Sequence, residues 1–249
     1  MDLVEKIEKN ENRHPWEISR AENIFKIVEH NSKDCVYADI GSGDMYFASK
    51  LPHITSEKIY CVDLNFSEEK EDGQLIQMID ASKIPAGSVD CLILMDVLEH
   101  VEDDARFLGN MLNMVKDNGH IIITVPAFQM FFSEHDKFLK HLRRYTISQL
   151  QRIVIENDLI LSRKFYFYTS LFIVRFFMML LRKIRPSKPA NKGIGAWRYG
   201  PNHYITKSIV HTLNMDFAAN KLLSTWGVTF FGLSICMVCQ KKIRAACAT

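Results

Sequence analysis

The fold class of this chain follows from the stretch Cys35-Val36-Tyr37-Ala38-Asp39-Ile40-Gly41-Ser42-Gly43-Asp44-Met45-Tyr46-Phe47. A short apolar run ends in an acid and is closed by two glycines, which favours a buried β-strand over a buried helix. Gly41 and Gly43 allow positive φ angles and a close approach of a ligand to the backbone. A helix that starts after this turn presents free backbone N–H groups. The stretch therefore predicts a strand, a glycine turn and a helix N-terminus, which together can hold a nucleotide-like ligand.

The composition is that of a globular protein. With 249 residues, of which 47% are hydrophobic and 24% charged, the chain is long enough for one large α/β domain or a domain with an appendage. Its net charge of +2 is too close to zero to indicate a nucleic-acid partner. The bases are nevertheless concentrated between residues 137 and 188, where Glu156 and Asp158 are the only acids. This basic zone suits an anionic substrate or a membrane surface.

The cysteines and the first residues indicate a reducing compartment. Three of the six cysteines lie in predicted buried strands, where cysteine acts as a small hydrophobe. Cys236 and Cys239 have a metal-ligand spacing, but they lie in a strand-like run and should point to opposite faces. We therefore expect core packing there and no metal. The first 13 residues are mostly polar and charged, without the apolar segment of a secretory signal. We predict a cytoplasmic protein.

Strands and helices are predicted to alternate along the chain. Strand patterns cover residues 35–40, 58–63, 75–79, 89–95 and 120–125. Helices are predicted over residues 1–30, from Met45 to before Pro52, over 103–115 with Asn118-Gly119 as a stop, over 147–156 after the N-cap Thr146, and over 211–224. For the first of these helices, packing is favoured over a role as a lid. This alternation indicates a doubly wound, Rossmann-like parallel sheet with helices on both faces.

Four acids follow the predicted strands. Asp39, Asp63, Asp80 and Asp96 each lie at or just after a strand end, so in a parallel sheet all four should surround one crevice. Asp63 comes 24 residues after Asp39, where a dinucleotide-type site places a carboxylate on ribose hydroxyls. The acids therefore predict a nucleotide-like ligand at the carboxyl ends of the strands.

Taken together, these segments resemble the class I S-adenosylmethionine-dependent methyltransferases, in particular the ubiquinone/menaquinone-methyltransferase-like group (methyltransferase type 11/12). The resemblance covers about residues 35–155 and rests on the whole set of segments, since each segment alone is a weak signal. The matching segments are Asp39-Ile40-Gly41-Ser42-Gly43, Val62-Asp63, Asp80-Ala81, Asp96-Val97-Leu98-Glu99-His100-Val101 and the glycine-led strand at residues 118–126.

The resemblance implies that S-adenosyl-L-methionine is the cofactor and that ten residues bind it. The glycine turn would lie against the methionine portion, with Asp39 below it, and Asp63 would accept hydrogen bonds from both ribose hydroxyls. Met45 departs from the family, which usually has a third glycine at that place. Its side chain would either crowd the cofactor or point into the sheet–helix interface. The ten residues are Asp39, Gly41, Ser42, Gly43, Asp63, Leu64, Asp80, Ala81, Asp96 and Val97.

Residues 127–146 occupy the place where the family builds part of its acceptor pocket. The segment is dense in histidine, arginine and aromatic residues, and its pattern resembles enzymes that modify surface glycans or lipid-linked precursors. A histidine there can serve as general base, because methylation of a hydroxyl requires loss of its proton. Arginines can clamp phosphate or carboxylate, or they can brace the loop. Candidate catalytic residues are His135, His141 and Tyr145, candidate substrate-binding residues are Arg143, Arg144 and His100, and no metal is expected.

The segment 166–185 is the most apolar helix candidate, and basic residues close it. Arg175 in its middle and its modest length exclude a membrane span. The helix either packs over the acceptor pocket, which we favour, or lies in a membrane interface with its bases on lipid headgroups. Residues 186–200 are predicted to be a flexible connection, and residues 230–239 the last strand, which the resemblance places antiparallel to its neighbour and next to the edge.

We thus expect one methyltransferase domain over residues 1–249. It has a helical lead (1–30), an acceptor loop (127–146) and a helical insertion with a flexible connection (166–205) before the last strand. Its sheet has about seven strands, mostly parallel with one antiparallel strand near the edge. The predicted function is methyl transfer to an oxygen or nitrogen of a small-molecule or lipid/glycan-linked acceptor.

Three other interpretations remain open. The chain could be a non-catalytic cofactor-binding protein, or a protein of the inner membrane surface that docks through residues 166–185. An NAD-dependent dehydrogenase is disfavoured, because Tyr46 occupies the place of the third glycine in the dinucleotide pattern. No nucleic-acid partner is expected. The sequence leaves the acceptor, the methylated atom and the oligomeric state undetermined.

Overall fold

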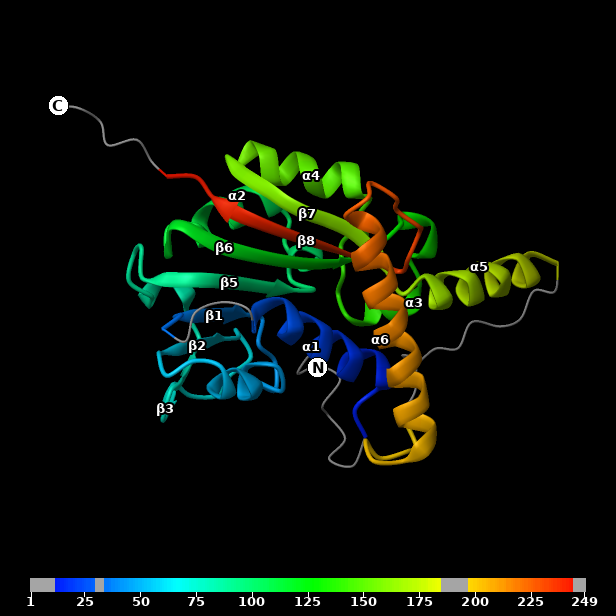
Figure 1. Ribbon diagram of the computed structural model, residues 1–249, viewed down its shortest axis with the longest axis horizontal. Helices are drawn as coiled ribbons and strands as arrows, with labels where there is room; N and C mark the ends of the chain where they lie inside the picture. Colours follow the sequence, from blue (N-terminus) through cyan, green and yellow to red (C-terminus); the bar gives the residue numbers. More distant parts are fainter. Residues whose placement is uncertain (1–11, 30–33, 185–196, 244–249) are drawn as a thin grey trace.

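The computed structural model describes residues 12–29, 34–184 and 197–243. At its centre is an eight-stranded sheet with the strand order β3-β4-β2-β1-β5-β6-β8-β7 (Figure 1). The strands are β1 (Tyr37–Ile40), β2 (Ile59–Val62), β3 (Lys70–Asp72), β4 (Leu75–Met78), β5 (Val89–Met95), β6 (Val115–Pro126), β7 (Leu159–Phe167) and β8 (Ser234–Lys241).

The sheet is parallel through its middle and antiparallel toward its edges. The strands β4, β2, β1, β5 and β6 pair in parallel, whereas β8 runs antiparallel to both β6 and β7. At the other edge β3 pairs antiparallel with β4. The predicted mostly parallel sheet is confirmed, as is the position of the last strand next to the edge. The small strand β3 brings the total to eight.

Helices cover both faces of the sheet. The helices α1 and α6 pack against one another in front of the sheet in Figure 1, and α2 and α4 lie on the other face. The α-helices are α1 (Pro15–Val28), α2 (Asp104–Met111), α3 (Glu134–Phe138), α4 (Ile147–Glu156), α5 (Thr169–Ile184) and α6 (Tyr204–Ser224). Short 3-10 helices are η2 (Ala48–His53), η3 (Ala81–Lys83), η4 (Leu98–His100) and η5 (Gln129–Phe131).

Two apolar cores follow from the alternation of side chains along the strands. Ala38 and Ile40 of β1 belong to the core under α2 and α4, and Tyr37 belongs to the core under α1 and α6. On β8 the same alternation places Cys239 in the first core and Cys236 in the second. The prediction that these two cysteines face opposite ways is confirmed.

The strand β7 was not predicted from the sequence. It follows α4 directly, and its last residues, Tyr166 and Phe167, were assigned to the apolar helix that in fact begins at Thr169. Two features hide the strand: Arg163 and Lys164 lie in its middle, and the register with β8 shifts between Leu161 and Arg163. A bulge of this kind breaks the strict alternation by which a strand is recognised.

The predicted helix from Met45 to before Pro52 is wrong. The chain forms only the 3-10 helix η2, which contains Pro52, and Met45 has a φ of 58°. Likewise, Asn118-Gly119 is not a helix stop, because α2 ends at Met111 and both residues lie inside β6. The last strand also begins later than predicted, at Ser234. In each case tertiary packing overrides the local signal.

The apolar helix α5 projects from the body of the molecule in Figure 1. No helix within the described residues is long and apolar enough to cross a membrane. Most of the predicted flexible connection, residues 185–196, lies outside the described residues. Its last part returns to the fold, since Trp197 forms a β-bridge with Asn12 near the start of α1.

We predict that Gly232→Ala destabilises the fold. A Cβ atom there would lie 2.2 Å from the backbone oxygen of Phe167, so β7 and the segment before β8 would have to separate. Overpacking of this kind costs about 1–3 kcal/mol. Urea unfolding measures the change, with Gly200→Ala as the control because its nearest atom is 3.6 Å away. Equal midpoints for the two variants would contradict this contact.

Candidate functional site

The glycine turn after β1 is tied to β2. Gly41 and Ser42 donate backbone hydrogen bonds to the carbonyl of Val62 at 2.8 and 3.0 Å, and the two glycines have φ angles of 73° and 54°. A Cβ atom on Gly41 would lie 2.7 Å from Cγ2 of Val97, in the loop after β5. Because Gly41 has no Cβ atom, the loop after β5 can pack closely against the turn. The sequence did not reveal this packing role.

Asp39 is buried directly before this turn. Its exposed fraction is 1%, and neither carboxyl oxygen has a hydrogen-bond partner among the described residues. The pKa of Asp39 is raised to about 7, chiefly by burial; the Asp63 carboxylate adds to the rise and Arg20 opposes it. Burying a polar group without a hydrogen-bond partner costs folding free energy. The Asp39 carboxyl group is therefore an acceptor that a hydrogen-bond donor of a bound ligand can satisfy.

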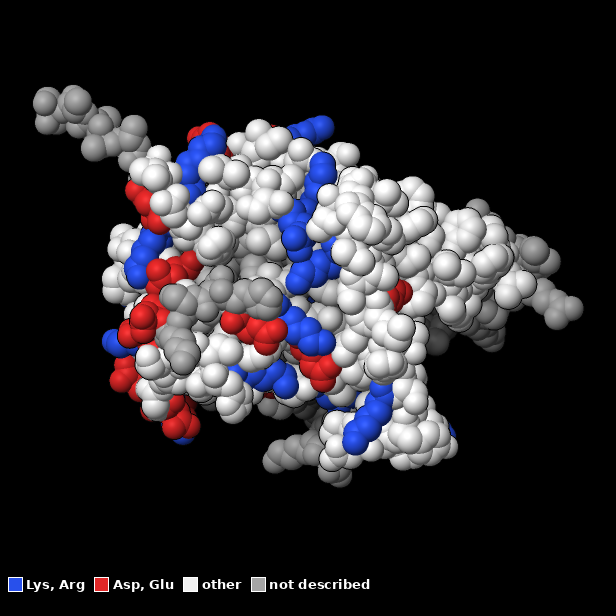
Figure 2. All heavy atoms as spheres, viewed as in Figure 1, with Lys and Arg blue, Asp and Glu red and all other residues white. Residues whose placement is uncertain are grey.

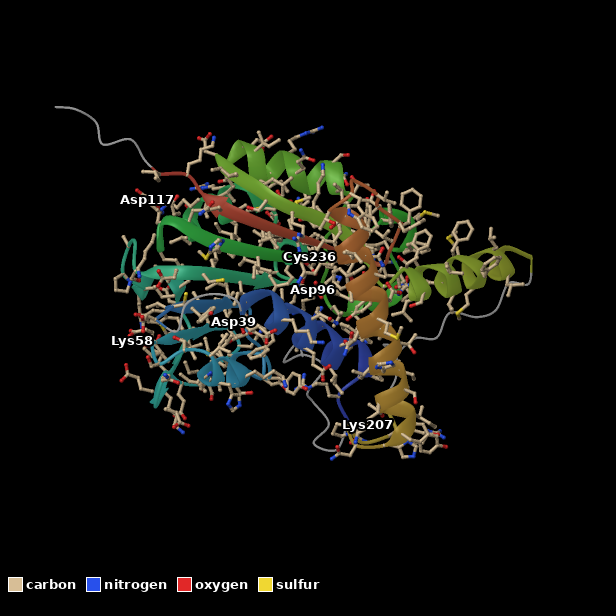
Figure 3. The ribbon with its side chains drawn as sticks, in the orientation of Figure 1. Asp39, Lys58, Asp96, Asp117, Lys207 and Cys236 are labelled. Atoms are coloured by element: carbon tan, nitrogen blue, oxygen red, sulfur yellow. The ribbon has the colours of Figure 1, made fainter. Side chains whose placement is uncertain are left out.

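Asp96 lies at the end of β5 and is held in an unusual backbone conformation. Its φ is 55°, and its carboxylate accepts a hydrogen bond of 3.1 Å from the Thr124 hydroxyl of the neighbouring strand. The other carboxylate oxygen pairs with Arg20 of α1. Figure 3 labels Asp39 and Asp96 where α1 crosses the sheet. The strand ends thus bring these two acids to one edge, as predicted.

The helix α1 contributes basic side chains that the sequence analysis missed. Besides Arg20, Arg13 pairs with Asp44 of the glycine turn and with Glu17, and its guanidinium lies 3.9 Å from the ring centre of Tyr46. The predicted packing role of α1 is confirmed by its contact with α6, but the helix also covers the turn. Arg20 lies in α1 and Arg13 directly precedes its N-cap, and these two arginines, seven residues apart, were the only sequence signal.

The other predicted cofactor residues differ in how much they are exposed. Asp63 is half-buried and accepts hydrogen bonds of 2.9 Å from the backbone N–H groups of Gly43 and Asn65, so it already braces the turn. Asp80 is exposed and caps η3, and hydrogen bonds from Ser82 lower its pKa. Ser42 is buried, Ala81 is half-buried, and Leu64 is 84% exposed.

Met45 adopts the left-handed conformation that usually favours glycine. Its side chain is half-buried against the core under α1. It therefore packs into the sheet–helix interface, which was the second of the two predicted orientations. Beside it a cavity of about 270 Å³ opens between the glycine turn and the loop after β2, lined by Gly43, Asp44, Met45, Asn65, Phe66, Ser67 and Gln77.

In the acceptor loop, Asp136 is the centre of a buried network. Its carboxylate accepts hydrogen bonds from the amide and hydroxyl of Ser133 at 2.8 Å and from Arg144 at 2.7 and 2.8 Å, and it lies 3.2 Å from Nδ1 of His141. Burial alone would raise the pKa of Asp136, but the hydrogen bonds and the charge of Arg144 hold it well below its usual range. Arg144 therefore braces the loop, which was one of the two roles predicted for the arginines of this segment.

Two further predicted residues also have structural partners. The Tyr145 hydroxyl is buried, 2.8 Å from Asp104 and 3.0 Å from the carbonyl of Leu98, and burial with the Asp104 carboxylate raises its pKa. Arg143 pairs with the same Asp104 at 3.1 Å. Tyr145 has no free hydroxyl for catalysis, so its predicted catalytic role is not supported. Both side chains fix the loop to the start of α2.

The histidines gather near the end of β5. The rings of His100 and His141 are 4.7 Å apart, and Nε2 of His141 is 4.0 Å from a carboxylate oxygen of Glu99. Glu99 is fully buried, its two oxygens have no hydrogen-bond partner within the described ranges, and burial raises its pKa to about 8. Burial lowers the pKa of His135, which lies in α3. Glu99 lies in the motif of residues 96–101, but no role was predicted for it from the sequence.

Comparison with known proteins identifies the domain. A family model described as a methyltransferase domain matches residues 38–123, from β1 into β6. These residues belong to the methyltransferase-domain family. No curated protein matches the chain.

Solved structures show the same fold. A Haemonchus contortus phosphoethanolamine N-methyltransferase 2, crystallised with phosphomonomethylethanolamine and S-adenosylhomocysteine, has a TM-score of 0.55 at 12% identity. The match covers 92% of this chain and 53% of that one, so the chain spans about half its length. An S-adenosylmethionine-dependent methyltransferase from Archaeoglobus fulgidus has a TM-score of 0.52 at 12% identity and covers 89% and 93%. The [4+2]-cyclase SpnF has a TM-score of 0.55 at 12% identity and covers 95% and 86%.

At these identities the solved structures establish the fold, which is that of the class I methyltransferases. The methyltransferase domain of this family binds S-adenosylmethionine. The residues present fit such a ligand: Asp39 and Ser42 each have buried oxygen atoms with no hydrogen-bond partner in the described part of the chain, beside a turn of positive φ angles. Fold alone does not give the reaction, as the cyclase shows, so the function has to be argued from the site.

We predict that the stability of the methyltransferase domain falls as the pH rises from about 4 to about 7, in part because of Asp39. Its pKa is raised by burial, so between these values the folded state binds more protons than the unfolded state. Asp39→Asn removes this titration. In the variant, the drop in Tm between pH 5 and pH 8 should be smaller than in the parent. The difference should be about 2–4 °C for each kcal/mol that the titration of Asp39 contributes to the free energy of unfolding.

Thermal unfolding at several pH values tests this prediction. Asp117→Asn is the matched control, since Asp117 is exposed on β6 (Figure 3). Superimposable pH profiles for Asp39→Asn and the parent would contradict the prediction.

Proposed function

We propose that this chain transfers the methyl group of S-adenosylmethionine to an oxygen or nitrogen atom of a small-molecule or lipid/glycan-linked acceptor. The observation that carries the proposal is the buried carboxyl group of Asp39 beneath the glycine turn of a methyltransferase domain, which has no hydrogen-bond partner among the residues that the structure describes. The bound cofactor supplies an electrophilic methyl group on a sulfonium centre. The protein's own task is then to hold donor and acceptor in line.

The cofactor would lie along the carboxyl ends of β1, β2, β4 and β5. In this proposal Asp63 accepts from the ribose, Asp80 with Ala81 meets the adenine, and the turn of Gly41, Ser42 and Gly43 faces the methionine portion. Asp96 and Val97 flank its end, and Leu64 lies beside the ribose. The position of Arg20, between Asp96 and Asp39, adds a cation suited to the methionine carboxylate.

The acceptor would bind between η4 and the loop of residues 127–146. His141 is the best-placed general base, because the Asp136 carboxylate lies 3.2 Å from its Nδ1 and orients the ring. With the proton on Nδ1, the lone pair is on Nε2, which can take the proton of an acceptor hydroxyl or ammonium. His135 remains a second candidate, and burial lowers its pKa, which favours the neutral form that a base requires. Arg143 and His100 border the same region.

We expect S-adenosylmethionine to bind the parent protein and to bind Asp63→Ala and Arg20→Ala about 10- to 100-fold more weakly. A hydrogen bond or ion pair to a charged group contributes about 1.5–3 kcal/mol, which corresponds to this range. Isothermal titration calorimetry measures the affinity. The matched controls are Arg152→Ala on the exposed face of α4 and Asp72→Ala on β3.

These titrations, together with an assay of methyl transfer, distinguish a methyltransferase from a non-catalytic protein. Absence of binding to the parent would refute the proposed cofactor site. Tight binding without methyl transfer to any nucleophile in a broad acceptor panel would favour a non-catalytic protein on the same fold.

A second proposal concerns where the acceptor is found. We infer that α5 lies in the interface of an anionic membrane, which would give the domain access to lipid-linked acceptors. Along α5 five apolar side chains are between 49% and 63% exposed, and their spacing places them on one face of the helix: Ile173, Val174, Phe177, Met178 and Leu181. Figure 2 shows this region almost free of charged side chains on the face in view.

The opposite face of α5 is anchored to the acceptor loop. Arg175 donates hydrogen bonds of 3.1 Å to the carbonyl of Phe131 and the hydroxyl of Ser133, and Phe172 packs on Phe128 and Phe131. The charge in the middle of the helix is therefore turned away from the apolar face. The chain continues with several bases, Arg182, Lys183, Arg185 and Lys188, which suit anionic headgroups. Both predicted roles of the segment, packing and membrane contact, are thus compatible.

We expect the protein to float with vesicles that contain phosphatidylglycerol and to bind phosphatidylcholine vesicles weakly. The double variant Phe177→Ser/Leu181→Ser should lower the partition coefficient at least about tenfold, because each apolar side chain contributes about 1.5–3 kcal/mol when buried. Met215→Ser on α6, where Met215 is 61% exposed, is the matched control. Equal flotation of parent and double variant, or none for the parent, would refute the membrane role.

A further inference from the structure

We infer that Glu99, His100 and His141 form a binding site for a divalent first-row transition-metal cation on the acceptor side of the cofactor site. The ligand atoms of the three side chains, one from each, all lie within 4.8 Å of one another. Glu99 and His100 come from η4, directly after β5, and His141 comes from the acceptor loop. The tertiary fold alone brings Glu99 and His141 together, since His141 comes 42 residues after Glu99 in the chain.

The chemistry of the three ligands fits such a cation. Two imidazoles and one carboxylate suit zinc, iron, cobalt and manganese, and three protein ligands leave open positions for water or substrate. Ligand atoms at about 2.0–2.2 Å from one tetrahedral zinc ion lie about 3.3–3.6 Å apart. The separation of 4.0 Å between Nε2 of His141 and a carboxyl oxygen of Glu99 therefore has to shorten when a cation binds.

Glu99 carries the argument for a ligand at this place. It is completely buried, and both of its carboxyl oxygens are without a hydrogen-bond partner in the part of the chain that the structure describes. A buried carboxyl group in this condition costs stability, so native proteins pair such groups or use them to coordinate a metal. A cation bound between Glu99 and the two imidazoles would supply the missing partner.

The surroundings are arranged as around a metal site. The carboxylate of Asp136 lies 3.2 Å from Nδ1 of His141, which fixes the ring and directs Nε2 toward Glu99. A carboxylate behind a ligating histidine is a common feature of metal sites, and it strengthens the ligand. Asp136 itself is saturated by Ser133 and Arg144. It is therefore a positioning residue here, and the proposed site departs from the expectation from the sequence that no metal is bound.

The site lies where an acceptor would meet the methyl group. Glu99 is three residues beyond Asp96 and follows the same strand end, so the cation would share the sheet edge with the cofactor. With Nε2 of His141 bound to the cation, the cation would take over from this histidine the activation of the acceptor, because an open position can bind an acceptor oxygen and lower the pKa of its hydroxyl. Only this role rests on the proposed methyl transfer; the binding of the cation does not.

The test is binding of Co²⁺ and Zn²⁺ to the full chain after removal of metals with a chelator. We expect one cation per chain, with a Co²⁺ absorption spectrum of nitrogen and oxygen ligands. Glu99→Gln, His100→Gln and His141→Gln should each weaken binding by about 10- to 100-fold. The matched controls His211→Gln on α6 and Glu156→Gln on α4 change exposed residues of the same types and should bind like the parent.

Circular dichroism and Tm establish that each variant is folded. Should the buried Glu99→Gln variant fail to fold, the half-buried His100→Gln and His141→Gln decide the outcome. The inference is overturned if the parent binds no stoichiometric cation, or if these variants bind as the parent does. A parallel titration with S-adenosylmethionine separates the two proposals: cofactor binding without cation binding refutes only the metal site, and the reverse refutes only the methyl-donor site.

Discussion

The parallel register of β1 between β2 and β5 is the constraint on which the site depends. Asp39 pairs with Cys61 on one side and Ile93 on the other, so the three strands end at nearly the same level. The glycine turn, Asp63 and Asp96 then meet at a single edge of the sheet. Because β1 is central and buried, its side chains have no freedom to slip, and a shift of one residue would turn Asp39 into the opposite core. The position of every candidate cofactor residue follows from this pairing.

A second group of buried charges fixes the acceptor side. Asp136 holds Arg144 and orients His141, and Asp104 holds Arg143 and the hydroxyl of Tyr145. Breaking one partner of a buried pair leaves an uncompensated charge, so such networks hold a loop in one conformation. The polar groups of the two arginines and of the tyrosine are therefore engaged in contacts that stabilise the loop. The histidines lie at the boundary between the cofactor site and the loop. The charged segment thus provides both the contacts that fix the loop and the candidate catalytic side chains.

The helix α1 and the helix α5 extend the site beyond the matched domain. Arg20 of α1 pairs with Asp96, and Arg13, just before α1, pairs with Asp44 of the glycine turn. Arg175 anchors α5 to the acceptor loop, while another face of α5 exposes apolar side chains. Neither helix lies within residues 38–123, which match the family. What distinguishes this chain from other methyltransferase domains is therefore carried by its flanking helices and its acceptor loop, and these determine which acceptor can approach.

The sequence by itself determined the doubly wound sheet, the glycine turn and the acids at the strand ends. These features depend on local patterns: apolar runs of strand length, glycines that permit positive φ, and acids directly after the runs. The antiparallel strand next to the edge was implied by the family resemblance. The strand β7, the 3-10 helix at η2, the partners of Tyr145 and Arg144, and the convergence of Glu99 with His141 were decided only by the tertiary structure. Each depends on contacts between segments far apart in the chain, where packing and the need to pair buried charges outweigh local preference.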